Sequence, residues 1–276
     1  MTNVTITSTY VSILKPDQTN LVTTWSGTGG KYVDTIALPV TGTYTIFLDP
    51  VDFQLGNMTL TLYDVPQDFM ATITPGGPPV TASITIPGQN GRVSFSGTAN
   101  QKVSLRMTSV TIPSTYVSIL KPDQTNLVTT WSGTGGQYVD TIALPVTGTY
   151  TIFLDPVDFQ LGNMTLTLYD VVDITGTVSV GGSSVPVSIT TPGQRAILTF
   201  DGTSGQQSTV RVTNNSIPWM TVQLNKPDGT QLTASSSGSA SFNLSTQTLP
   251  STGTYSIVVD PQSTNLGNLS VSVTNP

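Results

Sequence analysis

The chain has 276 residues and a net charge of −6, and only 9% of its residues are charged. It contains no His and no Cys, and its 15 acidic residues are all Asp. We expect no nucleic-acid binding, because phosphates require a basic surface. Without His, Cys and Glu, the usual general bases and activated thiols are missing, so we expect no catalysis. No apolar run is long enough to cross a bilayer, so we expect no membrane insertion.

One long stretch of the sequence occurs almost twice. Residues 8–65 return as residues 114–171, and the single change is Gln137 in place of Lys31. A looser third version, which includes MTVQLNKPDGTQL and LPSTGTYSIVVDP, closes the chain. Repetition at a fixed long period is typical of modular arrays, so it decides the architecture.

The repeats predict three units. Residues 1–66 correspond to the C-terminal half of a module, and residues 67–171 and 172–276 to two complete modules. Met1 aligns with Met107, which lies in the middle of a module. We therefore expect the sequence to be an excerpt of a longer repetitive polypeptide. The alternative is a natural start that truncates the first copy.

The composition favours β-structure, because Thr and the β-branched apolar residues favour strands while Gly, Pro, Asn and Asp mark turns. Short alternating runs are bounded by turn sequences such as KPDQTN, WSGTGG and PVTG. In the second unit the predicted strands cover residues 81–86, 92–96, 103–108, 115–120, 138–144, 149–154 and 164–169. This spacing predicts an all-β fold of tandem jelly-roll or immunoglobulin-like β-sandwich modules, with roughly eight or nine strands each.

Two local sequences predict specific contacts. Tyr44, Tyr150 and Tyr255 each follow the letters TGT at the start of a strand. A Tyr in this position should pack its ring over the edge of the core and hydrogen-bond its hydroxyl to a turn. In KPDQT and KPDGT, the Asp can accept a hydrogen bond from its own downstream backbone.

The half unit raises a physical problem. Its four or five predicted strands cannot close a two-layer sandwich, so an apolar face is left open. A neighbouring chain could supply the missing strands, the sequence could be cut from a continuous fibre, or residues 1–66 could pack on the second module. Strand complementation between chains is one hypothesis. An isolated, solvent-exposed folded layer over residues 1–66 would count against it.

Two polar patterns are candidate sites. Ser118 and Lys121, like Ser12 and Lys15, match an S-x-x-K pattern, but they lie on a strand instead of a helix, so we interpret the match as a coincidence. Four aspartates in the repeated DPVDF sequence are candidate metal ligands: Asp49, Asp52, Asp155 and Asp158. Turn capping, Ca²⁺ binding and paired-carboxylate catalysis are the alternatives, and hard cations such as Ca²⁺ prefer such oxygen ligands.

Aromatic residues near WSGTGG form the second candidate site. The candidates are Trp25, Trp131, Tyr32 and Tyr138. Exposed aromatic side chains on a sandwich edge can stack on sugar rings, and the alternative is ordinary packing in the core or at its edge. The third copy has Ser236 at the position of the Trp, so this feature is not shared by all modules.

The quoted patterns carry a resemblance. PGQ, then F-x-G-T, then the P-D-G-T turn, then TGTY and G-N-L resemble the tandem sandwich repeats of large bacterial secreted and cell-surface proteins. They are similar to the bacterial pre-peptidase C-terminal domain family. The resemblance implies jelly-roll-like sandwiches that act as accessory, stalk or binding units, sometimes with Ca²⁺. The acidic D-x-D strand of that family is replaced here by VSILKPD or VQLNKPD, which argues against its metal site.

We therefore expect a non-catalytic structural repeat, a stalk, spacer or fibre subunit of an extracellular bacterial surface or filament protein. The expected partners are copies of the chain itself or adjacent modules of a longer parent chain, and possible strand complementation would join them. The alternative is a carbohydrate- or calcium-binding accessory module of a secreted protein, with polysaccharide as partner. We expect no cofactor, apart from Ca²⁺ in that alternative.

Overall fold

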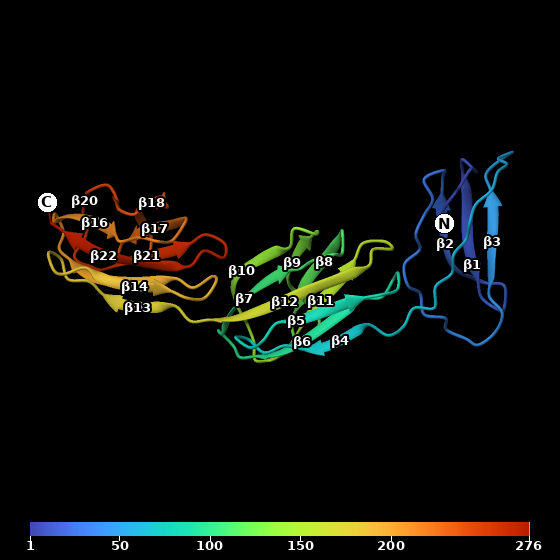
Figure 1. The fold of residues 1–276 in the computed structure, drawn as a ribbon, viewed down its shortest axis with the longest axis horizontal. Helices are drawn as coiled ribbons and strands as arrows, with labels where there is room; N and C mark the ends of the chain where they lie inside the picture. The colour runs from blue at the N-terminus through green and yellow to red at the C-terminus, as the bar shows by residue number, and fades with distance from the viewer. Residues whose placement is uncertain (276) are drawn as a thin grey trace.

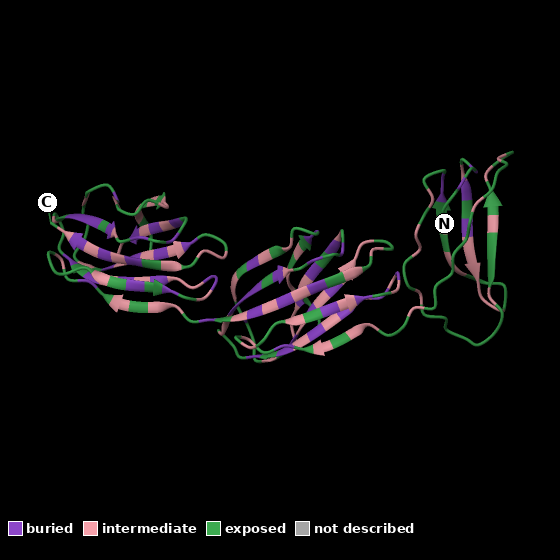
Figure 2. Cartoon of the chain, viewed as in Figure 1, coloured by how far each residue is buried: buried purple, intermediate pink, exposed green. Residues whose placement is uncertain are grey.

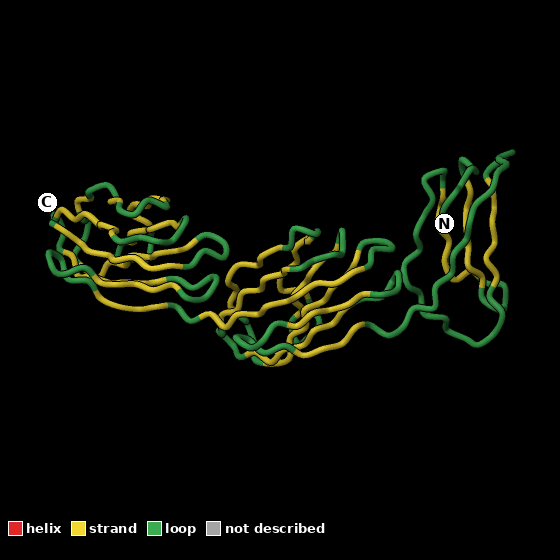
Figure 3. The backbone as a smooth tube through the Cα atoms, viewed as in Figure 1, coloured by secondary structure: helices red, strands yellow, loops and turns green. Residues whose placement is uncertain are grey.

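The structure is a computed structural model, and it describes residues 1–275. Three bodies follow one another along the long axis, from the N-terminal end in blue to the C-terminal end in red (Figure 1). Every regular element among the described residues is a β-strand (Figure 3). The described residues therefore contain no helix that could cross a membrane.

The first body, residues 1–66, is called the N-terminal layer. Its strands are β1 (Thr9–Leu14), β2 (Asn20–Ser26) and β3 (Thr45–Pro50), and they form one sheet in the order β2-β1-β3. Both neighbours of β1 are antiparallel to it. A bridge between Thr2 and Thr59 lies outside this sheet.

The second body is the middle sandwich, which consists of two facing sheets. One sheet has the order β4-β6-β11-β8-β9 and the other the order β10-β7-β12-β5. Strand β4 is parallel to β6, and the other paired neighbours are antiparallel. The strands are β4 (Phe69–Thr72), β5 (Val80–Ile84), β6 (Gly91–Gly97), β7 (Lys102–Thr108), β8 (Thr115–Leu120), β9 (Asn126–Ser132), β10 (Gln137–Ala143), β11 (Gly148–Pro156) and β12 (Gly162–Val171).

The third body, the C-terminal sandwich, has closely similar pairing. Its sheets are β13-β15-β21-β17-β18 and β14-β22-β16-β19, and β20 pairs with β16. The strands are β13 (Ile174–Thr177), β14 (Val185–Ile189), β15 (Ala196–Gly202), β16 (Gln207–Thr213), β17 (Met220–Asn225), β18 (Gln231–Ser237), β19 (Phe242–Asn243), β20 (Gln247–Thr248), β21 (Gly253–Pro261) and β22 (Gly267–Thr274). The all-β sandwich prediction is confirmed.

Each sandwich encloses its own apolar core (Figure 2). The TGTY tyrosines lie inside these cores: Tyr150 stacks on Phe95 with ring centroids 5.3 Å apart, and Tyr255 on Phe200 at 5.5 Å. The hydroxyl of Tyr150 donates a hydrogen bond to Val146 O (2.7 Å), so the predicted tie to a turn is confirmed. The rings are fully buried, not at the edge of the core.

Two strands of the middle sandwich were not predicted from the sequence. Strand β4 has only four residues, and β9 runs into the WSGTGG segment that we interpreted as a turn. Both lie at the edge of a sheet, where one side of the strand is unpaired and the apolar alternation is weak. The predicted Asp turn is confirmed, because Asp123 Oδ1 accepts a hydrogen bond from Thr125 N (3.0 Å).

The prediction of four or five strands in residues 1–66 is wrong, because the structure has three. The segments that correspond to β10 and β12, residues 31–37 and 56–65, form no strand here. In the middle sandwich, β10 and β12 both hydrogen-bond to β7, which lies between them. Of a β7 counterpart, residues 1–66 contain only Met1 and Thr2. The two flanking segments therefore make only the hydrogen bond from the Met1 amino group to Lys31 O (2.8 Å) and the Thr2–Thr59 bridge in place of the β7 pairing.

Candidate functional site

The middle and C-terminal sandwiches meet in a defined joint. The Pro192–Gly193 turn lies against β10 of the middle sandwich. Thr141 Oγ1 donates a hydrogen bond to Gly193 O (2.8 Å), and the buried Ser104 Oγ donates one to Pro192 O (2.8 Å). A Cβ on Gly193 would lie 2.6 Å from the hydroxyl of Tyr138, so the fit requires glycine at this position.

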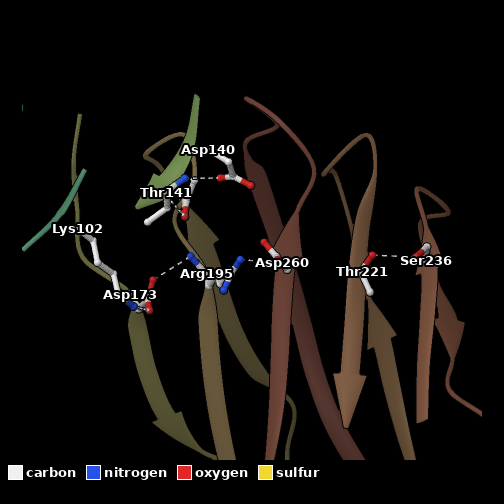
Figure 4. A network of polar contacts seen from close by, with 9 residues as sticks. Lys102, Asp140, Thr141, Asp173, Arg195, Thr221, Ser236 and Asp260 are labelled. Carbon is white, nitrogen blue, oxygen red and sulfur yellow. Dashed lines mark hydrogen bonds and ion pairs between the residues drawn. The ribbon is translucent and has the colours of Figure 1, made fainter. Parts of the chain in front are cut away.

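Charged side chains surround this joint (Figure 4). Lys102 Nζ lies 2.5 Å from Asp173 Oδ2, and this ion pair connects the two sandwiches. Arg195 Nη2 lies 3.1 Å from Asp260 Oδ2 within the C-terminal sandwich. Burial raises the pKa of Asp260, and the neighbouring Arg195 partly offsets this effect.

The same joint occurs between the N-terminal layer and the middle sandwich. Thr35 Oγ1 donates a hydrogen bond to Gly88 O (2.8 Å), as Thr141 does to Gly193 in the second joint. A Cβ on Gly88 would lie 2.7 Å from the hydroxyl of Tyr32. Both glycines come from the PGQ sequence, which we had noted as a shared pattern without assigning it a role.

The two joints differ in charge. Asn90 follows the PGQ sequence at the first joint, where Arg195 follows it at the second. Burial raises the pKa of Asp155 at the first joint, and the negative charge of Asp34 raises it further. Among residues 1–275 no basic side chain forms an ion pair with Asp155, so the first joint carries uncompensated negative charge.

The far end of the C-terminal sandwich departs from this pattern. In the middle sandwich, strand pairing places Tyr138 opposite Arg106. In the C-terminal sandwich, the residue opposite the equivalent Arg211 is Asn243. Thr209 and Thr246 hydrogen-bond to each other there (2.7 Å). This surface therefore lacks the tyrosine that the PGQ turns contact in the two joints.

The N-terminal layer leaves most of its apolar side chains uncovered. Of the hydrophobic side chains in residues 1–66, only those of Val4, Ile6 and Val11 are buried. The corresponding residues of the middle sandwich bury fourteen: Met107, Val110, Ile112, Val117, Ile119, Val139, Leu144, Tyr150, Ile152, Leu154, Met164, Leu166, Leu168 and Val171. Leu62 is 81% exposed, whereas its counterpart Leu168 is 0% exposed. The same sequence is thus closed in one place and open in the other.

The four predicted metal ligands lie at the ends of β3 and β11. Asp52 and Asp158 have positive φ angles of 55° and 54°, and Ser263 has 58° at the matching position. Asp and Asn tolerate this left-handed conformation better than most residues. The turn therefore accounts for a short polar residue at this position. Within residues 1–275, no three acidic side chains come together as a metal-ligand cluster.

The four aromatic candidates lie in two different settings. Trp25 and Trp131 are about half exposed, and their indole N–H groups donate to Ser8 Oγ (3.0 Å) and Ser114 Oγ (2.9 Å). Tyr32 and Tyr138 instead lie in the joints, against Gly88 and Gly193. The structure thus does not bring each Trp and Tyr together as one stacking platform.

Burial in the second joint raises the pKa of Tyr138 from 10.0 to about 12. Between these values the folded chain holds a proton that the unfolded chain has lost, so stability falls as the pH rises through this window. Subtracting the tyrosinate absorbance of the Tyr138→Phe variant from that of the parent chain isolates the titration of Tyr138. We expect this difference to have its midpoint near pH 12. A midpoint near 10 would show that the hydroxyl is not buried in the joint.

Comparisons with known proteins give similarity only among solved structures; no protein-family model and no curated protein matches the chain. The pre-peptidase C-terminal domain of a collagenase from Bacillus anthracis is 15% identical, and the match covers 37% of this chain and 96% of that domain, with a TM-score of 0.31. The periplasmic lysozyme inhibitor PliG from Aeromonas hydrophila is 21% identical, with coverage of 37% and 99% and a TM-score of 0.27. The tandem CBM22 domains of Xyn10C from Paenibacillus barcinonensis are 6% identical, with coverage of 66% and 82% and a TM-score of 0.21. A pre-peptidase C-terminal domain is thus among the structures to which the chain is similar.

Proposed function

We propose that the chain is a non-catalytic structural repeat, a stalk, spacer or fibre unit of an extracellular bacterial surface or filament protein. The observation that supports this proposal is the recurrence of one joint at both junctions. Covalently linked domains move relative to each other unless their interface restrains them. A chain whose role is to span distance benefits from a repeated restraint, because each module then adds a defined length and direction.

The composition is consistent with an extracellular location. The chain has no thiol to oxidise, and its few charges limit ionic attraction to other surfaces. Its partners in this proposal are adjacent modules of a longer chain or further copies of the chain. The unit boundaries at 66/67 and 171/172 stay a prediction.

Substitution of Gly193 tests the joint. In Gly193→Ala the new Cβ would lie 2.1 Å from Thr141 Oγ1. We expect a loss of about 1–3 kcal/mol from this overpacked contact, which would free the two sandwiches to rotate. Small-angle X-ray scattering should then report a broader distribution of interatomic distances than the parent chain.

Gly205→Ala is the matched control for this experiment. Gly205 has a φ of 85°, close to the 83° of Gly193, but an added Cβ meets no atom within 4 Å. Both variants therefore carry similar backbone strain, and only Gly193→Ala disturbs the joint. Scattering that is the same for both variants would contradict a restraining joint and with it the spacer proposal.

The second candidate function is a polysaccharide-binding accessory module, with or without Ca²⁺. The half-exposed Trp131, whose indole is oriented by Ser114, is the observation in its favour. Glycan-array binding that is lost in Trp131→Ala would support this candidate, and a melting temperature unchanged by a chelator would argue against the Ca²⁺ version.

A further inference from the structure

The N-terminal layer is incomplete in a way that identifies its missing part. It lies exposed to solvent, which by itself counts against strand complementation. However, it is not a fully folded layer, because residues 31–37 and 56–65 form strands only in the duplicate copy. The single sequence change between the copies, Lys31 to Gln137, is exposed in both, so it does not account for the difference in folding. The copies differ instead in the presence of β4–β7, which only the second copy has.

We propose that the N-terminal layer is an acceptor for a four-strand segment with the sequence pattern of residues 67–106 that is not contained in these 276 residues. Within this chain, residues 67–106 already close the middle sandwich and residues 172–211 the C-terminal sandwich. Neither segment is free to cover the layer. The donor must therefore come from outside these 276 residues.

The strand pairing of the middle sandwich shows how a donor should pair with the N-terminal layer, whose residues are numbered 106 lower than their counterparts. There β11 pairs with β6 so that Tyr150 is opposite Phe95 and Thr149 opposite Ser96. In the completed layer, Tyr44 should face a donor Phe95, and Thr43 a donor Ser96. A donor β7 should insert between residues 31–37 and 59–65, as β7 lies between β10 and β12.

Met1 lies in the layer where Met107 lies in the middle sandwich. A Cβ on Gly30 would lie 2.3 Å from Met1 O, and a Cβ on Gly136 would lie 2.3 Å from Met107 O. The bridge between Thr2 and Thr59 likewise repeats the pairing of Thr108 with Thr165. Met1 thus occupies the place of Met107, and the donor strand fits up to its Arg106.

Charge favours the same pairing. The donor pattern carries Arg92, Lys102 and Arg106 against one carboxylate, Asp68. The layer carries two lysines and five aspartates: Lys15, Lys31, Asp17, Asp34, Asp49, Asp52 and Asp64. A cationic donor and an anionic acceptor attract each other and associate faster than neutral partners. A donor Ser104 would also be placed to donate to Pro87 O at the first joint, as Ser104 does to Pro192 O at the second.

Cysteine cross-linking tests this register, because the chain contains no Cys of its own. The full chain carries Thr43→Cys, and the donor is a peptide of residues 67–106 with Ser96→Cys, fused at its N-terminus to a soluble carrier. Directly opposed residues of neighbouring strands are within disulfide distance. We expect a one-to-one covalent product, and protection of Lys31 from trypsin when the peptide is bound.

The duplicate copy supplies the control. Thr149 is the counterpart of Thr43 and has the same neighbours in sequence. In Thr149→Cys, however, the cysteine lies on β11, whose partner strand β6 is already present in the chain. We expect a yield at least about tenfold higher for Thr43→Cys, a preference of roughly 1.4 kcal/mol for the open site. A donor with Ser94→Cys, two residues out of register, should give much less product.

Three results would overturn the inference. Equal yields at Thr43 and Thr149 would mean that the peptide exchanges into closed sandwiches. Yields that do not depend on the position of the donor cysteine would mean non-specific aggregation. No product, together with a dimer held through residues 1–66, would mean that a second copy covers the face. The inference goes beyond the spacer proposal, because flexible joints would leave this cross-link unaffected.

Discussion

Tyr150→Ala is expected to destabilise the middle sandwich by about 3–5 kcal/mol, the range for removal of a large aromatic side chain from a core. Tyr150 is 0% exposed and stacks on Phe95, and its hydroxyl is hydrogen-bonded to the turn at Val146. Differential scanning calorimetry should show one transition moved to lower temperature. The transition of the C-terminal sandwich should stay in place, because that sandwich has its own core.

Tyr44→Ala is the matched variant in the N-terminal layer. Tyr44 keeps its hydrogen bond to Val40 O (2.7 Å), but the layer has no strand to supply a counterpart of Phe95. Its truncation should change neither sandwich transition, and any local effect should stay below about 1 kcal/mol. Destabilisation by Tyr44→Ala equal to that by Tyr150→Ala would show that the layer already has a closed core.

The fold could be predicted because its signals are local. Alternation along residues 149–154 matches the buried and half-buried residues of β11, and the Pro-Asp turn before Thr125 forms through contacts within a few residues. The edge strands were not predicted because their local sequence carries little of this alternation. Strand β9 buries little of its length, so its sequence carries almost no alternation.

The candidate site could not be predicted in this way, because it depends on what each segment meets. Tyr32 and Tyr138 sit in nearly identical sequence, and nothing local indicates that a glycine of the following module will lie against each hydroxyl. The PGQ repeat was the available signal, since a conformationally permissive glycine in every copy implies a close approach of backbone. Likewise, Leu62 and Leu168 have the same neighbours in sequence, and their opposite exposures follow from the presence of β4–β7 around the second copy.

Trypsin should cleave the N-terminal layer at Lys31 far faster than the same position of the middle sandwich. Proteases require a locally unfolded, extended backbone, so an exposed side chain within a paired strand is a poor substrate. Lys31 lies outside any strand and is held only by the hydrogen bond that the Met1 amino group donates to Lys31 O (2.8 Å), whereas position 137 begins β10, which pairs with β7 from Gln137 to Ala143. The variant Gln137→Lys makes the two sites identical in sequence from residue 8 to 65 and from 114 to 171.

With identical local sequences, the intrinsic cleavage rates at the two lysines are equal, and their ratio measures structure alone. If opening of β10 requires about 3 kcal/mol more than opening of residues 31–37, the ratio is roughly a hundredfold. Mass spectrometry of the early fragments measures it directly. Comparable cleavage at both lysines would mean that the two copies are equally ordered. The unpaired state of the N-terminal layer, on which donor binding depends, would then be wrong.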